Sequence, residues 1–257
     1  MNNVKKRLNI LFVTQEDPFY VKIFFKEFLE KYPDPSEIKG AVIGKTLGKK
    51  SLMQLVRQML GFYGLAGFFL MGTRYALKKA TGDSLKRLFT SKGIPCKEGV
   101  DVNSRFFIEE WRGKDIDVVI SVASSAIFKQ ALLEMPRWGC LNIHHAKLPK
   151  YRGMLPNFWQ MFNNEKYAGI TVHRMNPKID DGEIVAQREI EILPGESLDS
   201  LIKRSKKAGA ALMLEVIDKI RDGSVSYLKN DSAESSYFTF PGAADVKEFK
   251  RRGKSIL

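Results

Sequence analysis

The sequence predicts an α/β fold in which helices flank a mostly parallel β-sheet. Short, continuous apolar runs recur along the chain, and each has the length of a strand buried on both faces of a sheet. Segments with the periodicity of amphipathic helices separate these runs, as in a parallel sheet. The chain has 257 residues, 44% of them hydrophobic and 28% charged, so it can form a globular domain with a substantial core.

The first part of the chain opens as strand, helix, strand, which is the start of a Rossmann-like sheet. The predicted elements are, in chain order, a strand at 9–13, a helix at 19–32, a strand at 41–43, a strand at 115–122, a helix at about 126–134 and a strand at 140–143. Neither the Gly-x-Gly-x-x-Gly fingerprint nor a Gly-x-x-x-x-Gly-Lys-Ser/Thr loop is present, so the pattern does not indicate nicotinamide or ATP chemistry.

Residues 45–92 interrupt this alternation and are predicted to form a helical insertion. Met59–Gly72 has no charged residue, but the run contains four glycines and is shorter than the roughly 20 apolar residues that span a membrane. We favour a helical insertion packed on the domain. Because basic residues flank the run, the alternative is a peripheral contact of residues 57–80 with anionic lipid.

After Lys166 the pattern changes. Gly169–Met175 alternates as a strand does, and Glu183–Ile192 is predicted to form two short strand pieces. Ser197–Arg221 is a long amphipathic helix that begins at a serine N-cap and ends before a glycine. We therefore expect one domain over residues 1–221.

The remaining residues, 222–257, are predicted to be a short basic C-terminal extension without a second globular domain. The net charge of the chain is +13, and residues 41–100 carry eleven Lys and Arg against two acidic residues. A basic surface of this kind concentrates phosphates, nucleic acid or anionic lipid, although a merely solvated surface is the plainer alternative.

Cysteine content and the N-terminus favour a cytoplasmic protein. Cys96 and Cys140 each lie in an apolar stretch, which is typical of small core residues rather than of a disulfide or metal pair. The apolar run near the N-terminus is too short for a signal peptide.

A candidate catalytic set lies at the end of the strand at 140–143. Asn142 and His144 flank one residue there, so their side chains point to the same side, at the edge of the sheet where ligands bind. Asp180 and Asp181 follow in a later turn. An amide can hold an oxyanion, an imidazole can move a proton, and a carboxylate can favour the protonated imidazole. Such a set can transfer an acyl group to a nucleophile that the substrate supplies.

Each element of this set has a plainer interpretation: a structural histidine, or a simple turn at Asp180-Asp181. His144 and His145 could be metal ligands, but neighbouring side chains on a strand point apart and no metal motif supports the pair. We expect no metal.

Four segments, in this order, resemble the catalytic core of the folate-dependent formyltransferases: Gly139–His144, Leu148–Gly153, Gly169–His173 and Ile179–Gln187. That family includes the glycinamide ribonucleotide, methionyl-tRNA and nucleotide-sugar enzymes. The resemblance implies that Asn142, His144 and Asp180 are catalytic and that 10-formyltetrahydrofolate is the co-substrate. The positions that it implies for folate binding are Ser125, Ala126, Ile127, Phe128, Asn176, Ile179 and Asp180. His145, Ala146-Lys147 and Asp181 depart from the family's usual residues.

The resemblance favours an amino sugar, carried by a nucleotide or lipid, as the amine acceptor. Methionyl-tRNA enzymes have a C-terminal β-barrel, for which residues 222–257 are too few, so we expect no specific nucleic-acid binding. The expected acceptor contacts, several of them suited to a diphosphate, are Lys147, Lys150, Tyr151, Arg152, Gly153 and Arg174.

Other functions stay open. They are a 10-formyltetrahydrofolate hydrolase, a methionyl-tRNA formyltransferase-like enzyme without the C-terminal domain, and a non-catalytic basic module that binds nucleic acid or membrane. A homodimer is also open.

Overall fold

The apolar runs of the sequence form neighbouring strands of one sheet. The computed structural model describes residues 6–44 and 51–257. The strands of the sheet are β1 (Ile10–Gln15), β2 (Ile38–Gly44), β3 (Cys96–Glu98), β4 (Val118–Val122), β5 (Cys140–His144), β7 (Tyr167–Arg174) and β8 (Ile184–Glu191). Their order is β3-β2-β1-β4-β5-β7-β8, and the first five are parallel whereas β7 and β8 are antiparallel to their neighbours. The predicted α/β class is confirmed.

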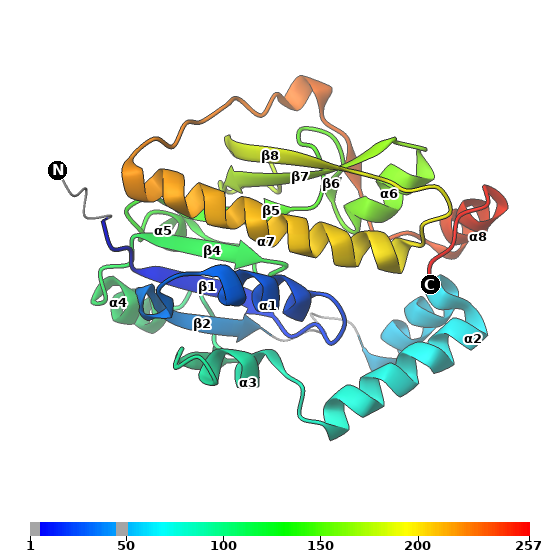
Figure 1. Ribbon diagram of the computed structural model, residues 1–257, viewed down its shortest axis with the longest axis horizontal. Coiled ribbons are helices and arrows are strands. Elements are labelled where there is room, and N and C mark those ends of the chain that lie inside the picture. The colour runs from blue at the N-terminus through cyan, green and yellow to red at the C-terminus, as the bar shows by residue number, and fades with distance from the viewer. Residues whose placement is uncertain (1–5, 45–50) are drawn as a thin grey trace.

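Helices cover both faces of this sheet (Figure 1). The helices are α1 (Val21–Lys31), α2 (Leu52–Ala80), α3 (Leu85–Thr90), α4 (Arg105–Arg112), α5 (Gln130–Leu133), α6 (Pro156–Phe162), α7 (Leu198–Asp222) and α8 (Ala243–Arg251), with short 3-10 turns at Pro35–Glu37 and Ser232–Glu234. α1 and α7 lie side by side on one face, and α4 and α5 pack on the other.

The side chains of β1 show why its apolar run has no polar interruption. Phe12 packs on the α1 side, where its ring meets Phe25 and Phe28 edge to face at 5.3 Å each. The adjacent Leu11 packs on the other side, with Trp111 of α4. Because successive strand residues point to opposite faces, both faces of the strand need apolar residues.

The C-terminal extension is packed on the domain. A two-stranded ribbon joins β6 (Arg152–Gly153) to β9 (Tyr237–Phe238) in parallel. In α8, the buried ring of Phe249 stacks on Phe158 of α6 at 4.5 Å. Residues after 222 thus contribute to a third apolar cluster, next to the end of β5.

The predicted insertion contains the helices α2 and α3. The structure describes it from residue 51 onward, and the predicted start at 45–50 lies outside the described residues. Ser51 begins α2 with a capping box, and Gly64 bends it because its φ of 72° is not helical. Most of α2 is exposed, so the expected packing on the domain is limited to a few side chains such as Phe62 and Met71.

Two predicted elements differ in extent. The helix expected over 126–134 is limited to α5, because the side chain of Asn103 accepts a bond from Lys129 N (2.8 Å) and donates to Ile127 O (2.9 Å), which holds the preceding residues as an irregular loop. The two strand pieces expected over 183–192 form one continuous strand, β8.

Candidate active site

Asn142, His144 and Asp180 meet at the end of β5. The first two side chains leave the strand toward the same side, and Asp180 approaches them from the loop between β7 and β8. Oδ2 of Asp180 lies 3.5 Å from Nδ1 of His144, and Oδ1 of Asp180 lies 3.5 Å from Nδ2 of Asn142. The structure therefore brings together the amide, imidazole and carboxylate singled out in the sequence.

The loop that carries Asp180 is held by groups distant in sequence. The backbone N–H of Gly153 donates to Oδ2 of Asp180 at 2.9 Å. Nδ2 of Asn230, in the C-terminal extension, donates to the carbonyls of Asp180 (2.9 Å) and Gly182 (3.0 Å). These bonds support the left-handed backbone of Asp180, whose φ is 50°. Sequence reasoning missed Asn230, since no local motif marks it.

Burial favours the neutral form of the His144 imidazole. Burial lowers the pKa of His144 below its usual value, and the nearby Asp180 only partly opposes this effect. The carboxylate of Asp180 does favour the protonated imidazole, as expected, but burial has the larger effect on the pKa of His144. Nε2 of His144 donates to the carbonyl of Tyr151 at 2.8 Å, so in the neutral ring Nδ1 carries the lone pair that faces Asp180.

Asp180 is ionised at neutral pH. Burial alone raises its pKa, but His144, His173 and the N–H of Gly153 outweigh burial and hold the pKa at about 2. A proton taken up on Nδ1 of His144 would therefore face a carboxylate that stabilises it.

His173 is a site residue that the sequence analysis did not single out. It is buried, and the antiparallel pairing of β5 with β7 places it directly opposite Asn142. Nδ1 of His173 donates to the carbonyl of Arg174 (3.1 Å), which leaves Nε2 to accept a bond from Nδ2 of Asn142 (3.1 Å). His173 thus orients the Asn142 amide. A usable signal was present, since all three histidines of the chain lie between residues 144 and 173.

His145 lies on the other side of the sheet from the catalytic set. Its Nδ1 is bonded to Oγ of Ser205 on α7 at 2.8 Å, and burial lowers its pKa well below the usual value. Within residues 6–44 and 51–257 no group of three or more His, Cys, Asp or Glu side chains is placed to hold a metal ion.

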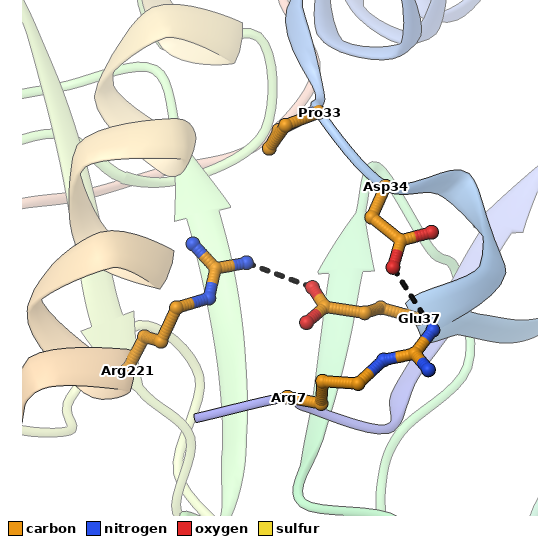
Figure 2. A pocket seen from close by; sticks show the side chains of 5 residues that line it. All are labelled: Arg7, Pro33, Asp34, Glu37 and Arg221. Carbon is orange, nitrogen blue, oxygen red and sulfur yellow. Dashed lines mark hydrogen bonds and ion pairs between the residues drawn. The ribbon is translucent and has the colours of Figure 1, made fainter. Parts of the chain in front are cut away.

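A surface pocket at the opposite end of the sheet is lined by charged residues but has a structural explanation. Figure 2 shows Arg221 of α7 paired with Glu37 (2.7 Å) and Arg7 paired with Asp34 (2.9 Å). Arg221 and Glu37 are buried, and they join the end of α7 to the turn before β2. The pocket lies at the start of β2, away from the strand ends that carry Asn142 and His144.

Comparison with known proteins settles the family. The profile of the formyl transferases ("Formyl transferase") matches residues 85–217, just over half of the chain. The chain belongs to the formyl transferase family. Curated relatives include the methionyl-tRNA formyltransferase of Agathobacter rectalis, 33% identical over 60% of this chain and 49% of the relative. That of Geobacter metallireducens is 34% identical over 70% of this chain and 59% of the relative. The chain spans about half the length of such relatives.

Solved formyltransferase structures have the same fold. A sugar N-formyltransferase from Shewanella has a TM-score of 0.59 at 18% identity, over 91% of this chain and 77% of that one. A phosphoribosylglycinamide formyltransferase from Anaplasma phagocytophilum has a TM-score of 0.62 at 15% identity, over 91% of this chain and 99% of that one. At these identities the likeness concerns the fold.

The residues predicted to bind the pterin of a reduced folate lie in two loops. Ser125–Ile127 lie exposed in the irregular loop after β4, and Ile179 lies exposed in the loop after β7. Phe128 is buried in an apolar cluster against which Met175 also packs, so both loops rest on the same cluster. Exposed apolar side chains at 127 and 179, beside irregular backbone, suit a flat ring with polar edges.

The predicted acceptor residues fall into two groups. Lys147 and Lys150 are exposed on the loop between β5 and β6, and Lys147 pairs with Glu189 at 3.0 Å. Tyr151 is buried and its hydroxyl donates to Glu165 (2.6 Å). The lysines thus lie where a phosphate could reach them, while Tyr151 supports the loop.

The other three predicted acceptor residues, Arg152, Gly153 and Arg174, make contacts within the fold. Arg152 is buried and pairs with Asp181 at 2.6 Å, next to the catalytic carboxylate. At Gly153 the backbone φ is 96°, and a Cβ would collide with the carbonyl of Phe238. The guanidinium of Arg174 lies against Gly139, at the start of β5, so the structure does not bring it to the end of the strand that carries His144.

Proposed function

We propose that this chain transfers a formyl group from 10-formyltetrahydrofolate to a primary amine. The observation that carries the proposal is the convergence of Asn142, His144 and Asp180 from two separate segments at the end of β5. The folate would supply the formyl group that is transferred. The chain supplies a hydrogen-bond donor, a proton carrier and a fixed negative charge at one place.

The side chains have distinct parts in the transfer. The neutral amine attacks the formyl carbon, and Nδ2 of Asn142, oriented by His173, donates to the oxygen that becomes negative. Nδ1 of His144 takes up the proton that the amine loses, and Asp180 stabilises the imidazolium. The same proton then passes to the folate nitrogen as its bond to the formyl carbon breaks.

We propose an amino sugar on a nucleotide or lipid as the acceptor. The exposed Lys147 and Lys150 lie on the loop that follows His144, where cations would suit a diphosphate. A structural neighbour from Helicobacter canadensis, at a TM-score of 0.55, is described in complex with folinic acid and dTDP-3-aminofucose.

One experiment tests reaction and acceptor together. The purified protein is incubated with 10-formyltetrahydrofolate and a panel of amino-sugar nucleotides, and tetrahydrofolate is followed by absorbance. Production that requires one acceptor, and that His144→Asn abolishes, supports the proposal. Formate release without an acceptor identifies a hydrolase instead. No turnover with any member of the panel contradicts a nucleotide-linked acceptor.

The second candidate is formylation of the methionyl group on initiator tRNA. The name of the curated relatives at 33% and 34% identity favours it. Charged initiator tRNA therefore belongs in the same panel. Its formylation in preference to every sugar would replace the proposed acceptor while leaving the catalytic set unchanged.

A further inference from the structure

Exposed apolar side chains are concentrated on α2. Of the seventeen large apolar residues exposed among residues 6–44 and 51–257, eight belong to this 29-residue helix. They are Leu52, Met53, Val56, Leu65, Phe69, Leu70, Tyr75 and Leu77. Scattered exposed apolar residues are ordinary on a soluble surface, but a concentration on one element is typical of a binding surface.

The shape of α2 places these residues away from the domain. The helix consists of two segments joined at Gly64. Figure 1 shows the bent α2 next to α8. Phe62 before the bend and Met71 after it are buried, so each segment is anchored on one side. Leu65 and Phe69, one helical turn apart, are 70% and 64% exposed. Their large side chains lie in water with no function in the packing of the domain.

The C-terminal segment fits against the glycines of α2. A Cβ on Gly61 would lie 3.9 Å from Cβ of Ala243, and a Cβ on Gly67 would lie 3.2 Å from Leu257. Nζ of Lys250 lies beside Gly64, at the bend. α2 and α8 therefore form one surface unit, which we call the α2–α8 face.

The charge of the α2–α8 face is basic. α2 contains no Asp or Glu, and its exposed basic residues include Arg57 in the first segment and Lys79 at the end of the second. α8 adds the exposed Lys247 and Lys250, whereas its Arg251 is paired with Glu248 at 2.6 Å. Basic side chains around exposed apolar ones complement a surface that is anionic outside and apolar beneath, which is the interface of a membrane with acidic lipids.

The geometry excludes a span across the bilayer. By length and composition alone, the helical stretch from Leu52 to Thr90 could cross a membrane. However, α2 is bent at Gly64; before the bend Phe62 is buried in the third apolar cluster, and after it the guanidinium of Arg74 lies 4.0 Å from the carboxylate of Asp199 on α7. A helix fixed to a soluble domain at two points can lie in the interface, but it cannot pass through the hydrocarbon core.

We propose that the α2–α8 face docks the protein on the surface of an anionic membrane. Leu65 and Phe69 enter the interface, while the exposed basic residues of α2, Arg57 and Lys79, contact acidic headgroups. This gives the protein a membrane-peripheral location. The proposal rests on the face alone and holds for any acceptor.

Flotation with phosphatidylcholine vesicles, with and without phosphatidylglycerol, tests it on the full chain. Leu65→Ser combined with Phe69→Ser should weaken vesicle binding by about a hundredfold, since each buried apolar side chain contributes roughly tenfold. The matched control is Phe106→Ser on α4, which lies at the opposite end of the molecule from α2 in Figure 1; Phe106 is 86% exposed. It should bind as the unmodified chain does.

Reversing the charge of basic residues measures their contribution to vesicle binding separately from that of the apolar side chains. Arg57→Glu with Lys79→Glu should weaken binding to the acidic vesicles at least about 25-fold, because each basic residue near such a surface contributes about fivefold. Lys92→Glu with Arg112→Glu, two exposed positions on other elements, is the matched control. Circular dichroism and binding of tetrahydrofolate establish that every variant is folded.

The proposal is supported if vesicle binding requires phosphatidylglycerol and is weakened by both pairs of test substitutions but not by the controls. Lack of binding by the unmodified chain overturns it. If light scattering then shows a dimer that Leu65→Ser with Phe69→Ser dissociates, the face is covered by a second copy instead. Equal binding by test and control variants also overturns it.

Discussion

Asp180→Asn removes the negative charge of the site while keeping its shape. The amide oxygen of Asn can still accept the N–H of Gly153, which is 2.9 Å from the carboxylate. What disappears is the charge 3.5 Å from Nδ1 of His144, which stabilises a proton there. We expect turnover to fall by about 10²–10⁴, the usual effect of removing a group that supports general acid–base catalysis.

The same substitution has a stability effect that can be worked from the pKa. Asp180 has a pKa of about 2 in the fold against 3.8 ordinarily, and this difference corresponds to about 2.5 kcal/mol of favourable interaction with the carboxylate. Since His144 is mainly neutral at pH 7 and the Asn variant keeps the bond from Gly153, we expect a loss at pH 7 that is smaller than this value. Because the folded pKa is lowered, this contribution is fully present above the unfolded value and disappears as the pH falls from about 3.8 to about 2.

Urea unfolding of both proteins from pH 7 downward, with single-turnover formyl transfer at pH 7, measures the two effects. The exposed Asp231→Asn is the control and should change neither. A stability difference that stays constant down to the lowest pH would refute the assignment of the charge. Turnover within a few-fold of the unmodified protein would refute the catalytic part of Asp180.

Three further predictions concern groups around this carboxylate. Asn142→Ala should lower turnover by about 10²–10³ with little change in tetrahydrofolate affinity, because the donor acts on the developing oxyanion; near-normal turnover would contradict this part. His173→Phe should lower kcat more than it raises KM, since the ring orients the Asn142 amide across the β5–β7 pair, and steady-state kinetics with both substrates checks this. Gly153→Ala should destabilise the fold by about 2 kcal/mol or more in urea unfolding, because φ is 96° and a Cβ would collide with the carbonyl of Phe238. The control is Gly93→Ala, where φ is 73° but no atom lies within 4 Å of the added Cβ. Its loss of stability measures the backbone strain without the collision.

The strands were the most predictable part of the fold. A run such as Val118–Ile120 is apolar on both faces because both faces are covered, and this is a local property. The helix expected over 126–134 was overestimated because a side chain from elsewhere, Asn103, holds its first half in a loop. The ribbon of β6 and β9 could not be foreseen, since its two-residue strands carry no periodic signal.

The candidate site was predictable where a motif is local. Asn142 and His144 share a side of β5 through simple alternation, and the turn with Asp180 carries its own carboxylates. The role of His173 depends on the register of β5 and β7, which pairs it with Asn142, 31 positions away. The role of Asn230 depends on the C-terminal extension, which returns to Asp180, 50 positions away.

The sequence by itself determined the α/β class, the resemblance to a family and the identity of three converging side chains, because these depend on local periodicity and on ordered motifs. Tertiary structure alone decided three other properties. It made His144 mainly neutral, because burial disfavours a charge more than one carboxylate favours it. It turned Arg152 toward Asp181 and left the apolar residues of α2 in water. Burial and pairing are properties of the packed chain, and the same residue in the same motif can have either outcome.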